Sequence, residues 1–180
     1  YFQKYTVMAL SKETILDVVR PVCAGVETVE HHGQLTLLIP IADIVDVCRE
    51  LRDNSLTQFT FLVDITAIDW NKKNSRFEVV YFLQSMANRA RVRLKVALPN
   101  DEHPHCPTVV GVWEAADWFE REAYDMYGIK FDGHPDLRRF YMPEDFADPS
   151  NAEPLYPLRK DFPLMGIPGS LPLPPMPEII

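Results

Sequence analysis

The chain has 180 residues, with 18 Lys and Arg against 26 Asp and Glu, so its formal net charge at pH 7 is −8. This length suits one ordinary domain, or one domain with a long tail. The hydrophobic content of 47% is typical of a folded protein and argues against wholesale disorder. The acidic balance argues against a nucleic-acid-binding protein, which needs a basic surface. The longest apolar runs, 60–68 and 79–83, fall short of the roughly 20 residues that span a bilayer.

The cysteine set argues against a metal or iron–sulfur centre in this chain. Cys23, Cys48 and Cys106 are widely spaced, and no C-x-x-C pair occurs. A cluster held by four thiolates cannot be built from three cysteines, and a tetrahedral zinc site is not expected either. An odd number of scattered thiols favours a reducing compartment without a disulfide scaffold.

The N-terminal half predicts helices and a hairpin. Residues 1–10 are poorly informative, because their start resembles the remnant of a protease-cleavage tag. Apolar residues at helical spacing predict a helix over 11–23, with Ser11 as its N-cap. A hairpin of strands 26–30 and 35–39 follows, and Pro40 then opens a second helix with one apolar stripe.

The middle of the chain predicts three strands and a long helix. The strands cover 59–69, 76–84 and 90–98, and the alternation in the last is typical of an antiparallel sheet with one wet face. A helix is expected over 113–127, with Thr108 placed to cap it and Gly128 placed to end it.

Proline dominates the C-terminal part of the chain. Eleven of the 16 prolines lie from Pro135 onward, which forbids long helices and central strands there. Because this stretch keeps many large apolar residues, we expect an extended Pro-rich arm that packs against its own domain or a partner. The predicted fold class is α+β: an antiparallel sheet of about four to five strands with helices on it over 11–133, and the arm over 134–180.

Charged residues crowd the predicted long helix and the turn after it. Arg121 lies four residues from both Asp117 and Asp125, so one guanidinium can bridge two carboxylates. Glu122 falls on the apolar side of the helix, so we expect its carboxylate either at the edge of the core or beside a cation from elsewhere, because burying it unpaired is costly. The two arginines at 138 and 139 follow closely and can fold back to supply it.

These residues admit two interpretations. The first is a structural charge network, with the turn Gly133-His134-Pro135-Asp136 directing two of its side chains. The second is an acid/base site that uses Glu122, Asp125 and His134. No nucleophile elbow, Gly-rich phosphate loop or dinucleotide fingerprint accompanies them, and the residues alone do not decide between the two.

The run from 120 to 139 resembles the signature of one family, the C subunit of respiratory complex I, the proton-pumping NADH:quinone oxidoreductase. A second, Pro-rich run over 156–163 is also similar to that family. The resemblance covers most of residues 11 to 165. The residues assigned to the signature and to subunit interfaces are Glu120, Arg121, Glu122, Asp125, Gly128, His134, Pro135, Asp136, Leu137, Arg138, Arg139, Tyr156, Pro157, Arg159 and Lys160.

The resemblance implies a non-catalytic scaffold subunit of the peripheral arm of that complex. Such a subunit has no catalytic, cofactor-binding or metal residues, while FMN and iron–sulfur clusters are expected in partner subunits. Its partners would be other peripheral-arm subunits, chiefly the quinone-pocket subunit and the one holding the last cluster, with NADH and quinone bound by the complex. Its place would be peripheral, on the cytoplasmic side of a bacterial inner membrane or the matrix side of an organelle.

Three other functions remain open from the sequence. Energy-converting membrane-bound hydrogenases and formate-linked complexes use a similar subunit. A stand-alone acid/base enzyme would use Glu122 and His134. A soluble interaction module would bind partners that have no part in electron transfer.

Overall fold

A computed structural model describes residues 10–72 and 74–163 of the chain. The expectations for residues 1–9 and for the tail from 164 to 180 concern residues outside these ranges.

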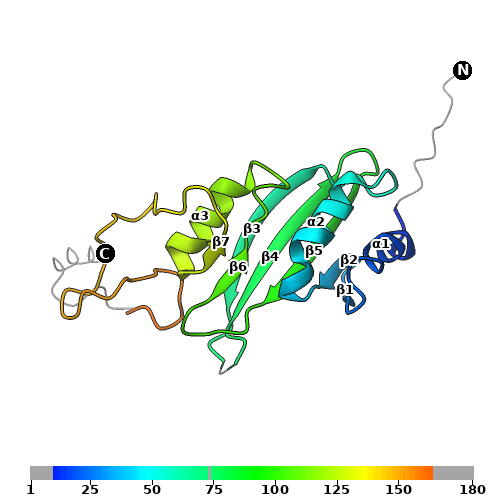
Figure 1. Cartoon of the computed structure of the whole chain (residues 1–180). Helices are drawn as coiled ribbons and strands as arrows, with labels where there is room; N and C mark the ends of the chain where they lie inside the picture. The colour runs from blue at the N-terminus through cyan, green and yellow to red at the C-terminus, as the bar shows by residue number, and fades with distance from the viewer. Residues whose placement is uncertain (1–9, 73, 164–180) are drawn as a thin grey trace, which may run out of the picture.

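A five-stranded mixed sheet forms the centre of the molecule (Figure 1). Its strands, in chain order, are β1 Glu27–His31, β2 Gln34–Leu38, β3 Phe61–Asp69, β4 Phe77–Ser85 and β5 Ala90–Ala97. In space the order is β1-β2-β5-β4-β3, and the neighbours are antiparallel except for the parallel pair β2–β5. The predicted α+β class is confirmed, and one pair in the mainly antiparallel sheet is parallel.

The helices in the described part of the chain are α1 Lys12–Val19, α2 Ile44–Asp53 after a 3-10 turn at Ile41–Asp43, and α3 Ala116–Tyr127. Ser11 caps α1 as predicted, because its hydroxyl accepts a hydrogen bond from the Thr14 N–H at 3.1 Å. Gly128 ends α3 as predicted, with a left-handed φ of 74°.

The predicted cap of α3 was wrong. The N-cap of α3 is Ala115, which makes no side-chain hydrogen bond, and the helix begins at residue 116 rather than 113. Thr108 instead donates its hydroxyl to the side chain of Glu120 in the middle of the helix. The loop before α3 is therefore fastened to the helix body and not to its first turn.

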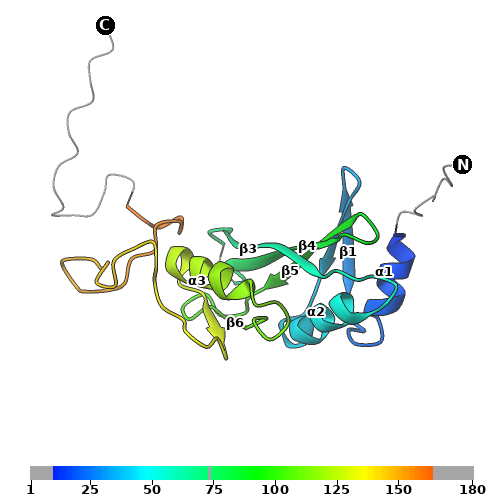
Figure 2. The same ribbon diagram turned by 90° about the horizontal axis from the view of Figure 1, so that it is seen from above.

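The helices leave part of the sheet uncovered. Figure 1 shows α2 crossing in front of the sheet, while α3 lies beside β3 together with the short parallel pair β6 His105–Pro107 and β7 Lys130–Asp132. Figure 2 shows α2 and α3 below the sheet, and no helix above β3, β4 and β5. Side chains that alternate along β4 and β5 fill the covered side and include Tyr81 and Leu94, which are fully buried.

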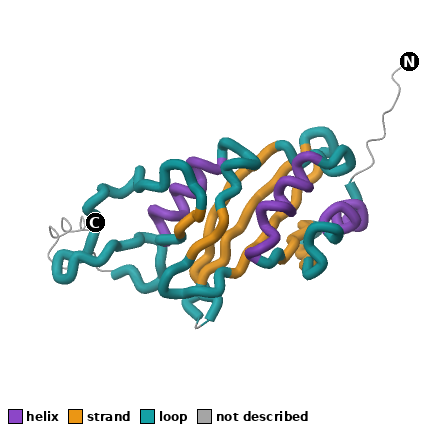
Figure 3. The backbone as a smooth tube through the Cα atoms, in the orientation of Figure 1, coloured by secondary structure: helices purple, strands orange, loops and turns teal. Residues whose placement is uncertain are grey.

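Residues 133–163 contain no helix or named strand, only the isolated bridge between Ala147 and Pro154. Figure 3 shows this C-terminal segment, residues 134–163, as loops beyond the end of α3. Within the residues that the structure describes, no helix is both long enough and apolar enough to cross a membrane.

Candidate functional site

The signature residues gather where α3 meets the C-terminal segment, and Asp125 lies at their centre. Its side chain is fully buried on α3. Oδ1 accepts a hydrogen bond from Nη1 of Arg139 at 3.0 Å. Oδ2 accepts the backbone N–H groups of Phe140, Tyr141 and Met142 at 3.2, 2.8 and 2.9 Å. A buried carboxylate with an ion-pair partner and three N–H donors is well compensated for its loss of water.

Arg139 joins α3 to a later part of the same segment. Its Nη2 donates to the carbonyl of Leu155 at 3.0 Å, and its guanidinium lies 5.1 Å from the ring centre of Tyr156. Only 7% of its side chain is exposed. The pair formed by Asp125 and Arg139 therefore fixes two separate stretches of the C-terminal segment on one helix.

The predicted bridge from Arg121 to two carboxylates does not form. Nε of Arg121 donates instead to the carbonyl of Arg138 at 3.1 Å. Its guanidinium lies 4.8 Å from the ring of Trp118 and 5.3 Å from that of Phe140. Asp125, one intended partner, is already satisfied by Arg139 and by backbone donors, so Arg121 supports the backbone of the turn and the aromatic rings beside it.

Glu122 is half-buried and is not paired with Arg138 or Arg139. Arg138 turns outward and pairs with Asp136 at 2.9 Å, where both side chains are exposed, and Arg139 is held by Asp125. A charged neighbour of Glu122 is Asp64 on β3. Burial first, and then the charge of Asp64, raise the pKa of Glu122, and burial also raises the pKa of Asp64.

Glu120 has a role that sequence reasoning did not identify. Its fully buried carboxylate accepts from the Thr108 hydroxyl at 2.5 Å and from the Val109 N–H at 2.7 Å. Burial raises the pKa of Glu120 to about 7, although both hydrogen bonds work against the increase. The side chain fastens the loop that enters α3, and no sequence pattern marks Thr108 as its partner.

His134 is fixed by hydrogen bonds within the turn. Its Nε2 donates to the carbonyl of Asp117 at 3.1 Å and lies 3.1 Å from Oδ1 of the same residue, while Nδ1 accepts the Asp136 N–H at 3.0 Å. The His134 side chain is fully buried. Asp117 and Glu122 are five residues apart on the helix, roughly 140° around its axis. The contacts of His134 and Glu122 therefore lie on different sides of α3, and the structure does not bring them together as an acid/base pair.

The second signature run closes the C-terminal end of α3. The N–H of Leu158 donates to the Met126 carbonyl at 3.1 Å, and Nε of Arg159 donates to the Tyr127 carbonyl at 2.5 Å. These carbonyls have no partner within the helix. The C-terminal end of a helix also carries a partial negative charge, which the positive charge of Arg159 stabilises. The Arg159 guanidinium lies 4.3 Å from the centre of the Tyr156 ring.

Gly128 allows this close approach. A Cβ atom at this position would lie 2.5 Å from Nη2 of Arg159 and 2.6 Å from Cζ of Tyr156. Its φ of 74° also favours glycine. Gly128 therefore serves both the helix end and the packing of Tyr156 and Arg159 over it.

A third attachment joins Asp69 and Arg76, which sequence reasoning missed, to Lys160 and Asp161 of the second signature run. Asp69 and Arg76, at the facing ends of β3 and β4, form two hydrogen bonds of 2.8 and 2.6 Å. The Lys160 N–H donates to Asp69 Oδ2 at 2.8 Å, and Asp161 Oδ2 accepts from Arg76 Nη1 at 2.9 Å. Burial favours a higher pKa for Asp69, but the bonds from Arg76, Lys160 and Asn71 outweigh it and lower the pKa to about 2.

The remaining signature residues act through packing and backbone. Leu137 is partly buried against the core, Pro135 is exposed and Pro157 is half-buried. Lys160 contributes its N–H group, and its side chain is exposed. In the described ranges, 10–72 and 74–163, no three His, Cys, Asp or Glu side chains are grouped to hold a metal ion.

Comparison with known proteins identifies the family of this chain. A family model described as "Respiratory-chain NADH dehydrogenase, 30 Kd subunit" matches residues 37–168. The second NADH-quinone oxidoreductase C subunit of Rhizobium meliloti is 50% identical over 135 residues, which are 75% of this chain and 69% of the relative. The NADH-quinone oxidoreductase C subunit of Caulobacter vibrioides is 46% identical over 134 residues, 74% of this chain and 64% of the relative.

Two solved structures are also similar. One is Nqo5, determined as a trypsin-resistant fragment, with a TM-score of 0.56 and 31% identity over 69% of this chain and 98% of that chain. The other belongs to the membrane-bound sulfane sulfur reductase, an archaeal respiratory membrane complex, with a TM-score of 0.67 and 28% identity over 84% and 85% of the two chains. The family model, the relatives and Nqo5 together show that this chain belongs to the 30 Kd subunit family of respiratory-chain NADH dehydrogenases, the family of the NADH-quinone oxidoreductase C subunit.

Proposed function

We propose that this chain is a non-catalytic scaffold subunit in the peripheral arm of a proton-translocating NADH:quinone oxidoreductase. It is needed for assembly, and through assembly for electron transfer from NADH to quinone by the whole complex. FMN and the iron–sulfur clusters belong to partner subunits in this proposal. Its main contacts are the subunit that lines the quinone pocket and the subunit that holds the last cluster.

The proposal rests mainly on one observation: most of the charged signature side chains bind other parts of the same chain. Asp125 and Arg139 hold each other and the backbone of the C-terminal segment, and Arg159 closes the end of α3. Glu120 fastens a loop. Groups that are buried and satisfied within the chain are suited to holding a shape. A catalytic group would need access to a substrate.

The surface around this attachment is suited to burial against a neighbour. Trp118 and Tyr141 are each 57% exposed, and Leu158 is 51% exposed, with the partly exposed ring of Phe140 between Trp118 and Tyr141. Aromatic residues are enriched at protein interfaces, and a group of exposed apolar side chains on one region marks an interaction site. The three attachments of the C-terminal segment hold these side chains in place before any partner binds.

The division of the chain into an α+β domain over 11–133 and an arm over 134–180 belongs to the same proposal. So does the location: peripheral, on the cytoplasmic side of a bacterial inner membrane or the matrix side of an organelle. The relatives named above are subunits of respiratory oxidoreductases, and one similar structure belongs to a membrane-bound complex.

One observation supports a second candidate function. The similar protein in the membrane-bound sulfane sulfur reductase matches 84% of this chain. The same fold is therefore also found in a respiratory complex whose name gives a different reaction. An energy-converting hydrogenase or formate-linked complex could use the same scaffold. The identity of 46–50% to subunits of NADH-quinone oxidoreductases favours the first function.

A pull-down in mild detergent from native membranes tests the proposal. The tagged full chain is purified with its partners, and the eluate is assayed for NADH:quinone turnover, flavin, iron and nickel. Turnover with flavin and iron is the expected result. Nickel with hydrogen-linked activity would support the second candidate, and a monomer without redox partners would contradict both.

A further inference from the structure

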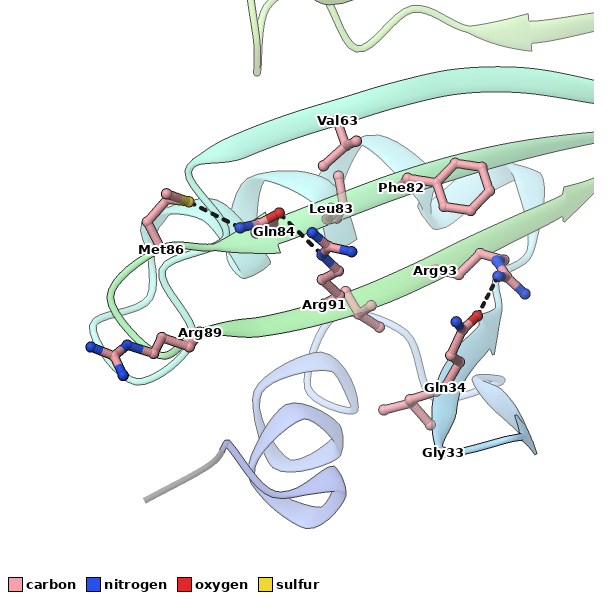
Figure 4. Close-up of a pocket in the computed structure, with 12 residues that line it drawn as sticks. Gly33, Gln34, Val63, Phe82, Leu83, Gln84, Met86, Arg89, Arg91 and Arg93 are labelled. Carbon is pink, nitrogen blue, oxygen red and sulfur yellow. Dashed lines mark hydrogen bonds between the residues drawn. The ribbon is translucent and has the colours of Figure 1, made fainter. Parts of the chain in front are cut away.

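A groove crosses the face of the sheet that carries no helix. It encloses about 800 Å³ between the β1–β2 turn at Gly33 and the β4–β5 turn near Met86 (Figure 4). Its floor comes from β4, β5 and the bulge of β3, where Val63 interrupts the register with β4. None of the family signature residues lines it.

Three arginines give this groove a strong positive charge. Arg89, Arg91 and Arg93 follow one another along β5 and the turn before it. Residues of the described ranges that line the groove include no Asp or Glu, and these arginines form no ion pair with any described residue. The groove is therefore positive, although the chain as a whole carries a net charge of −8.

The side-chain partners of Arg91 and Arg93 are amides. Arg91 Nε donates to Gln84 Oε1 at 3.2 Å, and Arg93 Nη2 donates to Gln34 Oε1 at 2.7 Å. The next cation on the same face of β5, Lys95, is neutralised by Glu78 at 2.7 Å. The amide oxygens orient the two guanidinium groups and leave their charge uncompensated.

The groove also has an apolar part. The ring of Phe82 lies in its floor with the guanidinium of Arg93 5.1 Å from its centre (Figure 4). Val63 and Met86 are 41% and 64% exposed along its edges. Nε of Arg93 is buried and has no hydrogen-bond partner among the described residues. A ligand for this groove therefore needs both negative charge and apolar surface.

We propose that this groove binds an extended acidic segment of a neighbouring subunit, with two carboxylates two residues apart and an apolar side chain on the same face. Arg91 and Arg93 share a face of β5 at a spacing of roughly 7 Å, which is the spacing of alternate side chains on an extended segment. The planar fork of arginine suits paired recognition of carboxylates. The inference rests on the proposed function, because it requires the chain to be one subunit among several.

An anionic membrane surface fits the groove less well. Recognition of anionic lipids typically uses clusters of four to eight basic residues on an exposed surface. Here three arginines lie along a hollow with an aromatic ring in its floor. A concave site with oriented arginines favours a protein segment.

The first test is photocrosslinking in the intact complex. A benzophenone amino acid replaces Met86 at the groove edge, and the crosslinked peptide is identified by mass spectrometry after purification. The expected peptide comes from another subunit and carries two Asp or Glu residues two positions apart. Crosslinks to lipid, to a peptide without such carboxylates, or to no other molecule would overturn the proposal.

The second test is charge reversal with rescue. Arg91→Glu with Arg93→Glu is expected to lower retention of the chain in the salt-washed complex about tenfold or more, because close charge pairs at interfaces are coupled strongly. Changing the two crosslinked carboxylates to arginine should restore retention. Arg49→Glu on α2, an exposed arginine away from the groove, is the matched control and should leave retention unchanged. Arg91→Gln with Arg93→Gln removes the two charges without reversing them and should give an intermediate loss of retention. This variant keeps the test valid if the glutamate variant folds poorly.

The two proposals fail in different ways. If the unmodified chain joins no redox complex, the proposed function is wrong. If it joins the complex and the glutamate and glutamine variants are retained as well as the unmodified chain, only the assignment of this groove is wrong.

Discussion

Asp125 and Arg139 form a buried ion pair in which the carboxylate also accepts three consecutive backbone N–H groups. Helix α3 supplies the anion, and the chain after β7 wraps around it. This relationship explains why two neighbouring arginines in the signature have different environments. The side chain of Arg138 is 63% exposed, and that of Arg139 is 7% exposed.

We expect Arg139→Gln to lower the free energy of unfolding by about 3 kcal/mol or more, because it leaves a buried carboxylate without its cation. Arg138→Gln, which removes an exposed pair with Asp136, should cost no more than about 1 kcal/mol. Chemical denaturation of the two purified variants measures both values. Equal losses for the two arginines would show that burial of the Asp125 pair does not stabilise the fold.

Gly128→Ala should release Tyr156 and Arg159 from the end of α3. The added Cβ lies within 2.7 Å of both side chains, and φ is positive. Gly133→Ala is the matched control, since its φ is 84° but its nearest neighbour is the Thr108 methyl at 3.4 Å. Left-handed strain alone costs about 1–2 kcal/mol, so the control should be milder. Hydrogen exchange at the Leu158 and Arg159 amides should accelerate in the first variant, and similar rates in both would contradict the steric account.

We expect the free energy of unfolding to fall in acid because of Asp69. Its pKa of about 2 in the folded state lies below the ordinary value of 3.8, so its contribution is present above pH 3.8 and disappears as the pH falls toward 2. The shift corresponds to about 2 kcal/mol at neutral pH. Asp69→Asn should lose this amount at pH 7 and little at pH 2. Asp53→Asn, at an exposed pair with Arg52, should show a much smaller difference between the two pH values.

For Glu120 we expect the opposite trend, a fall in the free energy of unfolding as the pH rises. Its pKa of about 7 exceeds the ordinary 4.5, so the folded state holds a proton that the unfolded state releases, and stability falls as the pH rises from 4.5 to 7. Glu120→Gln keeps one donor and one acceptor for Thr108 and Val109. The variant should gain about 3 kcal/mol relative to the wild type between pH 4 and pH 8. Parallel stability curves for the two proteins would show that Glu120 is not the group responsible.

Local signals in the sequence were sufficient for most elements of the fold. Ser11 and Gly128 mark helix ends through short-range chemistry, and the hairpin at Gly33 lies within a few residues of both its strands. The parallel pairing of β2 with β5 was not predicted, because strand patterns indicate which face is buried and do not specify the neighbour.

The contacts within the site were harder to predict from the sequence than the elements of the fold. Spacing on a helix suggested Arg121 as the partner of Asp125, but a cation 14 residues away and three N–H donors take that place. Asp69 and Arg76 flank a predicted turn, so their pairing was accessible from the sequence. Their contacts with Lys160 and Asp161, about 90 residues away, depend on tertiary packing alone.

The most direct test of the scaffold account compares Arg139→Gln with Arg138→Gln in the whole membrane complex. Each variant is expressed in place of the native chain, and two quantities are measured: the fraction of complexes that contain the chain, and the NADH:quinone turnover per intact complex. The account predicts that Arg139→Gln lowers the first quantity and leaves the second unchanged, while Arg138→Gln affects neither. Normal assembly of the Arg139→Gln complex with abolished turnover would contradict it and would place this arginine in the chemistry.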